Sequence, residues 1–207
     1  GAQEFAQAAA QAIPDSAAVA VLRPGYRDAA GRASPGELGA ETGDNYTADR
    51  IAMVGESIAA LRARYPAART ILVGDSGGAA IVANLAGIRP GLVDGMVLVS
   101  CPCTLPEWRQ HMRRRMPAAG WDGSVASLDP LKTAGGILPS IRAAVLVGAE
   151  DAVTPVKFSR AYAEALTLRG IATDYRIVPG KDHNLLNDPQ VLAATQRLAA
   201  SLARKTT

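Results

Sequence analysis

The chain has 207 residues, of which 48% are hydrophobic, so it is long enough to bury a sizeable core as one domain. Its 22 basic and 19 acidic residues are spread along the chain and leave a net charge of only +3, which argues against a nucleic-acid partner. No apolar run reaches the about 18 residues of a membrane span, and residues 1–25 lack a signal-peptide pattern. The compartment stays open, with the cytoplasm slightly favoured, and the oligomeric state stays unknown.

Short apolar strands alternate with helical patterns along the chain. Residues 1–13 read as a helix, and apolar residues recur at helical spacing over 51–61, 158–166 and 192–202. The predicted strands are Ala17–Arg23, Thr70–Gly74, Met96–Ser100, Ala144–Gly148 and Asp174–Val178. Nearly continuous apolar strands between helices indicate an α/β protein, whose mostly parallel sheet has helices on both faces. We find no linker that would divide residues 1–207 into two domains.

The string GDSGG, residues 74–78, is typical of two unrelated serine-hydrolase designs. It surrounds the nucleophile of trypsin-like proteases, and it also fits the Gly-x-Ser-x-Gly elbow of α/β hydrolases. Here it follows a predicted strand and precedes a helix-forming segment, which favours the elbow, with Ser76 on a tight turn. Gly74 and Gly78 would remove side chains where strand and helix pack closely. The trypsin-like order needs a histidine before the serine, whereas His111 and His183 both follow it.

Two polar residues follow later predicted strands and complete a candidate triad with Ser76. Asp151 comes after the strand at 144–148, and His183 comes after the strand at 174–178. Loops after parallel strands meet at one edge of a sheet, so we expect the three side chains to converge. Ser76 would attack a carbonyl, His183 would move the proton and Asp151 would orient the imidazole. Glu150 is the second candidate for the acid, and Asp182 is a weaker one.

These motifs together resemble the α/β-hydrolase family over nearly the whole chain. LRPGYRDAAGRASPG resembles the loop after the fourth family strand, VGDSGG the nucleophile elbow and GMVLVSCP the sixth strand. VLVGAEDAVTP resembles the acid loop and VPGKDHNLL the histidine loop. The last third is most similar to the compact prolyl-oligopeptidase-like and dienelactone-hydrolase-like branches. The resemblance implies Ser76, Asp151 and His183 as the triad and the Gly77 backbone N–H as one oxyanion donor.

The resemblance also implies a strand that we do not find. The first predicted strand, Ala17–Arg23, resembles the family's fourth, so the third strand and its oxyanion donor have no counterpart. We therefore expect an N-terminally incomplete form of a longer chain, with roughly 30–80 further residues upstream. The alternative is that Arg23–Tyr26 supplies the second oxyanion donor.

Residues 101–140 form a short insertion that resembles a lid or one wall of the substrate pocket. Trp108, Met112, Met116 and Trp121 are candidates for lining an acyl or side-chain pocket, and the alternative is that they only pack this segment onto the body. The basic run 113–115 is read as a solvated helix face. Cys101 and Cys103 are expected to be free thiols.

The sequence therefore predicts a serine hydrolase that cleaves an ester, thioester or amide through an acyl-enzyme. We expect no cofactor and no metal, and a small-molecule ester or a short peptide as the substrate. The alternatives are a serine peptidase of the prolyl-oligopeptidase-like type and a non-catalytic binding protein with the same fold.

Overall fold

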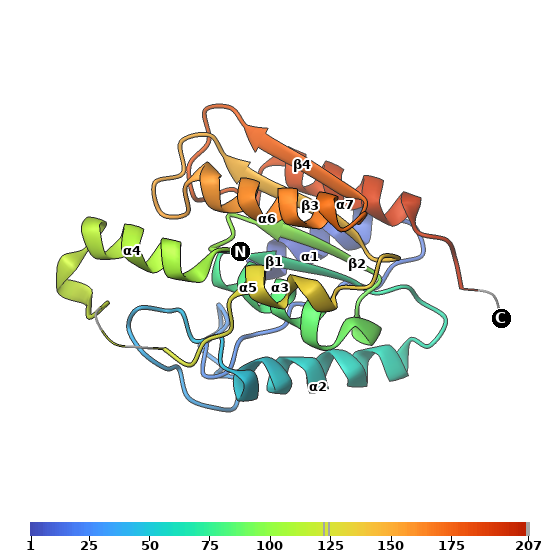
Figure 1. The fold of residues 1–207 in the computed structure, drawn as a ribbon. Coiled ribbons are helices and arrows are strands. Elements are labelled where there is room, and N and C mark those ends of the chain that lie inside the picture. Colours follow the sequence, from blue (N-terminus) through green and yellow to red (C-terminus); the bar gives the residue numbers. More distant parts are fainter. Residues whose placement is uncertain (122, 124, 206–207) are drawn as a thin grey trace.

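The computed structural model describes residues 1–121, 123 and 125–205, and its centre is a four-stranded parallel sheet (Figure 1). The strands are β1 (Ile71–Asp75), β2 (Gly95–Val99), β3 (Arg142–Gly148) and β4 (Thr173–Val178), adjacent to one another in chain order. In the register, Val73 is opposite Val97, and Val97 is opposite Ala144. All four strands therefore end at the same edge of the sheet, which is where the candidate residues follow them.

Helices cover both faces of this sheet, as the sequence predicted. On one face lie α1 (Ala2–Ala12) and α7 (Pro189–Ser201), and on the other lie α2 (Ala48–Arg64), α3 (Gly77–Ile88) and α6 (Val156–Leu168) (Figure 1). Neighbouring residues of a strand point to opposite faces. In β2, Met96 and Leu98 accordingly pack on the α3 side, while Val97 and Val99 pack against α1 and α7.

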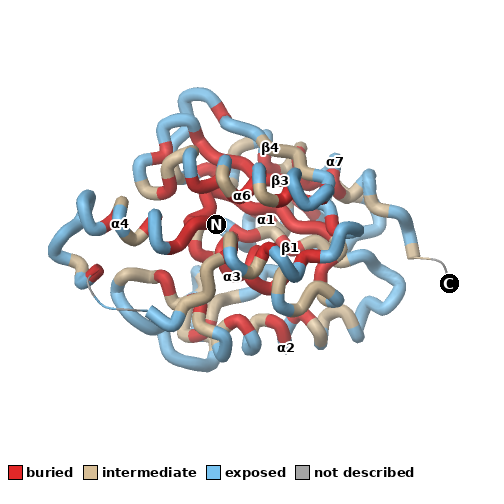
Figure 2. The backbone as a smooth tube through the Cα atoms, viewed as in Figure 1, coloured by how far each residue is buried: buried red, intermediate tan, exposed pale blue. Residues whose placement is uncertain are grey.

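The two apolar layers make the central strands the most buried part of the molecule (Figure 2). Every residue of β2 is buried, and so are all residues of β3 after Arg142. This explains why these strands read as continuous apolar runs rather than as alternating patterns. The fold is α/β with a parallel sheet flanked by helices, which confirms the predicted class.

The prediction of a strand at Ala17–Arg23 is wrong. In the structure this segment forms no strand, and Ala17–Val21 is exposed, with Val19 51% accessible. A strand needs a hydrogen-bonded neighbour, and none of the described strands pairs with this segment. The β-branched residues that suggested a strand thus remain unpaired. Among the described residues, β1 forms one edge of the sheet.

The segment between β2 and β3 carries α4 (Leu105–Arg115) and the short α5 (Pro130–Thr133). It also carries single-turn 3-10 helices at Pro117–Ala119 and Ala134–Gly136. A further one, Pro90–Leu92, precedes β2. The predicted lid-like insertion at 101–140 covers this segment, except that residues 122 and 124 lie outside the described part of the chain. It projects from the end of the sheet where the strands stop (Figure 1).

The expectation of free thiols at Cys101 and Cys103 is also wrong, because the two residues form a disulfide. They lie just after β2, and their Cα atoms are 5.1 Å apart, within the range that a disulfide spans. Both residues are fully buried.

This disulfide can be tested by alkylation and mass spectrometry. In the unfolded, non-reduced protein we expect iodoacetamide to add no mass, because both sulfurs are bonded to each other. After reduction it should add two carbamidomethyl groups. Alkylation of both residues without a reductant would contradict the disulfide.

Asp94 joins the start of the sheet to α2. Its Oδ2 accepts hydrogen bonds from the Thr70 amide (2.7 Å) and from the Arg62 guanidinium (3.2 Å), and Arg69 Nη1 lies 3.4 Å from Oδ1. Partial burial raises the pKa of the Asp94 carboxyl, but these hydrogen bonds outweigh it and hold the pKa below its ordinary value of 3.8.

We therefore expect Asp94→Asn to lower the free energy of unfolding by about 1–3 kcal/mol at pH 7. Since the folded-state pKa is depressed, this contribution is complete above pH 3.8 and is lost as the pH falls through the lower folded-state value. Urea unfolding of the wild type and the variant at pH 7 measures the difference in the free energy of unfolding, and the same measurement below pH 3.8 shows whether that difference is lost. The control is Asp174→Asn, because the surface pairs of Asp174 with Arg176 and Arg197 are worth under about 1 kcal/mol.

Candidate active site

Ser76 lies on a sharp turn between β1 and α3. Its φ of 56° and ψ of −118° place a non-glycine residue in a sparsely populated backbone region. The Ser76 amide donates to the carbonyl of Val99 on the neighbouring strand, at 2.8 Å, which holds the turn against the sheet. A Cβ on Gly74 would lie 2.6 Å from the backbone nitrogen of Ala79, so strand and helix approach too closely for a side chain there.

Gly78 does not share this role. A Cβ on Gly78 would have no atom within 4 Å, so its expected part in close strand–helix packing is wrong. Gly77 is the first residue of α3, and its backbone N–H is one of the amides that no carbonyl of the same helix can accept. This is the position that an oxyanion donor requires.

A continuous line of hydrogen-bonding groups joins the three predicted triad residues. Ser76 Oγ lies 3.0 Å from His183 Nε2, and His183 Nδ1 lies 2.9 Å from Asp151 Oδ2. The three residues come from the loops after β1, β3 and β4 and meet at the carboxyl edge of the sheet. If Nδ1 carries the imidazole proton and donates it to Asp151, Nε2 is left as the acceptor for the Ser76 hydroxyl.

Asp151 is 5% exposed and is surrounded by donors. Its Oδ1 accepts from the amides of Val153 (2.9 Å) and Thr154 (2.8 Å), and its Oδ2 accepts from Thr154 Oγ1 (2.7 Å). Burial raises the pKa of this carboxyl, but the hydrogen bonds from His183 and Thr154 outweigh burial, so the pKa lies below its ordinary value. Asp151 therefore stays ionised at neutral pH.

The other two candidate acids lie elsewhere in the same loops. Glu150 is exposed, and none of the side-chain hydrogen bonds of the described residues joins it to His183. Asp182 is exposed as well, and its Oδ1 accepts from the amide of Asn184 at 2.9 Å. The geometry thus singles out Asp151 among the three.

Two residues that support the histidine were missed in the sequence. Thr154 Oγ1 lies 3.1 Å from His183 Nδ1, besides its bond to Asp151. Ser100 directly follows β2 in a left-handed conformation, with a φ of 52°, and its Oγ donates to the backbone carbonyl of His183 at 2.9 Å. No local pattern signals either contact, since Ser100 and His183 are 83 positions apart.

The structure separates the four candidate pocket residues. Trp108, Met112 and Trp121 belong to the buried core, and Met116 is 49% exposed. The two tryptophan rings contact each other edge to face, with centroids 5.3 Å apart. The indole of Trp108 donates to the carbonyl of Val153 at 3.0 Å, so it also connects α4 to the acid loop. Contact of any of the four with a substrate stays a prediction.

His111 adds a second connection between α4 and the acid loop. Its Nε2 lies 2.7 Å from the carbonyl oxygen of Ala152, the residue after Asp151. This contact lies outside the line of hydrogen-bonding groups from Ser76 to Asp151.

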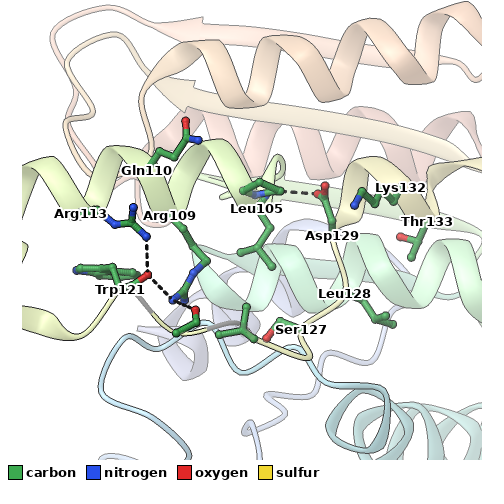
Figure 3. A pocket seen from close by; sticks show the side chains of 13 residues that line it. Leu105, Arg109, Gln110, Arg113, Trp121, Ser127, Leu128, Asp129, Lys132 and Thr133 are labelled. Atoms are coloured by element: carbon green, nitrogen blue, oxygen red, sulfur yellow. Dashed lines mark hydrogen bonds between the residues drawn. The ribbon is translucent and has the colours of Figure 1, made fainter.

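A cavity of about 480 Å³ lies beside α4, and its lining also includes Trp121, Ser127, Asp129 and Thr133 (Figure 3). Trp121 is the one candidate pocket residue in its wall, and none of the triad residues lines it. Arg109 crosses this region to form a buried ion pair with Asp44 and also donates to the Trp121 carbonyl at 3.1 Å. The cavity is therefore separate from the three-residue cluster.

Neither a metal cluster nor a membrane-spanning helix is found within the described residues. No three or more His, Cys, Asp or Glu side chains gather there as metal ligands do. No helix over the same residues has both the length and the apolar character needed to cross a bilayer.

Comparison with solved structures identifies the fold. A lipase/esterase from Lactobacillus plantarum superposes with a TM-score of 0.56 and 19% identity, over 81% of this chain and 71% of that one. An esterase from Pyrococcus furiosus gives a TM-score of 0.61 and 12% identity, over 75% and 63% of the two chains. An acylaminoacyl peptidase from Pyrococcus horikoshii gives a TM-score of 0.61 and 13% identity, over 79% of this chain and 30% of that one.

These neighbours are α/β hydrolases, and the chain has the α/β-hydrolase fold. The resemblance seen in the sequence motifs is thereby confirmed at the level of the fold. No protein-family model matches the sequence, and no curated protein matches it.

Proposed function

We propose that this protein is a serine hydrolase that cleaves an ester, or a thioester or amide, through an acyl-enzyme. One observation carries the proposal: the unbroken line from Ser76 Oγ through His183 to Asp151, at the edge where the four strands of the sheet end. A strained serine before a helix, a histidine within 3.0 Å and a buried carboxylate behind it are what nucleophilic acyl transfer requires.

In the proposed reaction Ser76 Oγ attacks the carbonyl carbon, and its proton moves to His183 Nε2. The carbonyl oxygen becomes an oxyanion beside the Gly77 N–H, at the positive end of α3. Asp151 stabilises the imidazolium through Nδ1. The tetrahedral intermediate then collapses, the leaving oxygen takes the proton from Nε2, and an acyl-Ser76 ester remains. Water, deprotonated by His183, repeats the sequence and releases the acid.

An ester is the first choice of substrate because the described chain has neither a propeller nor a large cap over the sheet edge. The lipase/esterase and esterase among the structural neighbours are consistent with this choice. The similarity to an acylaminoacyl peptidase, which spans 30% of that longer chain, keeps a peptidase as the second candidate.

The proposal is tested with a fluorophosphonate probe, which labels an activated serine covalently. We expect the wild-type protein to be labelled at Ser76, with no labelling of Ser76→Ala. A protein that folds but is not labelled would refute the activated serine and favour a non-catalytic binding role. The matched control is Ser57→Ala, which removes an exposed helix hydroxyl and should leave labelling unchanged.

A substrate panel then separates the two hydrolase candidates. p-Nitrophenyl esters of increasing chain length and aminoacyl anilides are compared by kcat/KM. A preference for the esters supports the first choice, and a preference for the anilides would replace it with the peptidase.

A further inference from the structure

The guanidinium of Arg23 lies against the residue that follows the candidate nucleophile. A Cβ added to Gly77 would overlap Arg23 Nη1 and would lie 3.1 Å from Arg23 Cζ. The same Cβ would lie 3.2 Å from Tyr46 Oη. Two side-chain donors from outside the triad therefore face Gly77, whose own backbone N–H begins α3.

Several contacts hold the guanidinium in this place. Arg23 Nη2 donates to the carbonyl of Gly43 at 2.9 Å, and Arg23 Cζ lies 4.4 Å from the centroid of the Tyr26 ring. The ring of Tyr46 adds a second aromatic neighbour, 5.6 Å from Cζ. Ser34 Oγ also donates to the Arg23 backbone carbonyl. Because Nη2 is hydrogen-bonded to Gly43 and the guanidinium plane packs on the Tyr26 ring, Nη1 is the nitrogen that faces Gly77.

The charge of Arg23 is not neutralised by the described part of the chain. None of the ion pairs among residues 1–121, 123 and 125–205 includes Arg23. A cation is also disfavoured near the first residue of a helix, where the dipole is positive. An anion at this point reverses both effects, because it is attracted by the guanidinium and by the helix end together.

Tyr46 places a second side-chain donor beside Gly77. The residue is 2% exposed, and its hydroxyl makes no hydrogen bond within the described residues, although the oxygen is not one of the described buried polar atoms that lack a partner. Burial raises the pKa of this phenol, so the hydroxyl keeps its proton and remains a donor. The hydroxyl is therefore available to donate a hydrogen bond to an oxygen atom that lies between Tyr46 and Gly77.

We propose that Arg23 Nη1 is the second oxyanion donor, acting on the same oxygen as the Gly77 N–H. This inference rests on the serine-hydrolase function proposed above. As Ser76 Oγ bonds to the carbonyl carbon, the C=O π electrons move to oxygen, and Nη1–H donates to the resulting negative charge. No proton leaves Arg23, and the donor is released when the C=O bond re-forms. A guanidinium from the loop after residue 22 thus does the work that a second backbone amide would do.

The test uses Arg23→Met and Arg23→Lys, with Arg27→Met as the control. Arg27 is an exposed arginine of the same loop, and its Nη1 donates only to the nearby carbonyl of Gly31. For Arg23→Met we expect kcat on the best p-nitrophenyl ester to fall by about 10²–10³, the loss typical of removing one oxyanion donor. KM should change by less than about threefold, because the charge exists only in the transition state. Arg23→Lys should recover part of kcat, and Arg27→Met should match the wild type.

A trifluoromethyl ketone provides a readout that a purely structural role would not move. It forms an anionic hemiketal with the serine, so its Ki should rise in Arg23→Met by the factor by which kcat/KM falls. An unchanged kcat would overturn the proposal, and so would a raised KM with normal kcat, which would assign Arg23 to ground-state binding. In both cases fluorophosphonate labelling of Ser76 would persist, so the hydrolase function would stand. Absence of fluorophosphonate labelling in the wild type is a separate result, and it would refute both the hydrolase function and the role of Arg23 as an oxyanion donor.

Gly77→Ala is a second variant that keeps Arg23 in the chain. The added methyl displaces Nη1 while the residue 77 backbone N–H is retained. We expect a loss of kcat in the wild-type background and a much smaller loss in the Arg23→Met background, because the displaced donor is already gone. Equal losses in the two backgrounds would show that Arg23 does not act through this position.

Discussion

Ser76→Ala is expected to lower kcat by about 10³–10⁶ with little change in stability. The substitution removes the atom that forms the acyl-enzyme in the proposed reaction and deletes one 3.0 Å contact to His183 at a partly exposed site. His183→Ala should cause a loss of the same size, because no other base lies beside Ser76 Oγ in the described structure. The measurement is steady-state ester hydrolysis, with thermal unfolding to show that each variant folds.

The matched control for the histidine is His111→Ala. This change deletes the contact to the Ala152 carbonyl but leaves the line from Ser76 to Asp151 in place, so most of the activity should remain. Wild-type activity in Ser76→Ala would eliminate the covalent scheme. Loss of activity in His111→Ala but not in His183→Ala would indicate that His111 on α4, rather than His183, is the general base.

Asp151→Asn is expected to lower kcat by about 10⁴. An amide in this position can present its NH₂ to His183 Nδ1, which favours the tautomer with the proton on Nε2 and removes the acceptor for the Ser76 hydroxyl. Glu150, the second candidate for the acid, would reduce this loss if it could substitute for Asp151, but it is exposed and makes no hydrogen bond to His183 in the described residues. We therefore expect no rescue.

The pH profile adds a check on this variant. The pKa of Asp151 lies below its ordinary value in the folded protein, so the wild-type carboxylate does not titrate near neutral pH. The loss in Asp151→Asn should therefore persist across pH 6–9 rather than disappear at one end. Asp182→Asn is the control, since its carboxylate contacts only the Asn184 amide. An Asp182→Asn loss larger than that of Asp151→Asn would reassign the acid.

The parts of the fold that depend on local pattern were predictable. The central strands β2 and β3 are buried and apolar, and polar residues or a glycine turn follow the strands of the sheet. The order serine, acid and histidine, combined with the rule that parallel strands end at one edge, predicts that Ser76, Asp151 and His183 converge, and the three side chains lie within hydrogen-bonding distance in the structure. Gly74 was predictable for the same reason, because a tight strand-to-helix turn excludes a side chain.

The features that depend on distant contacts were not predictable. Ala17–Arg23 has the composition of a strand, but a strand exists only where another strand pairs with it, and the sequence of the segment does not contain that information. Cys101 and Cys103 are too close in sequence to suggest a disulfide framework, and their pairing depends on the backbone conformation that the chain adopts after β2. Ser100 and Thr154 are ordinary polar residues until the histidine loop folds against them.

The two hydrogen bonds from α4 to the acid loop have a consequence for how the protein can move. Trp108 binds the Val153 carbonyl and His111 binds the Ala152 carbonyl, while the amide of Val153 also holds Asp151 Oδ1. Any outward swing of α4 breaks both bonds, at a cost of about 0.5–1.5 kcal/mol each, and frees the backbone that fixes the carboxylate. Opening of this helix and alignment of the histidine are thus thermodynamically linked. By the same linkage, any interaction that stabilises His183 in its position beside Asp151 also stabilises the contact of α4 with the acid loop.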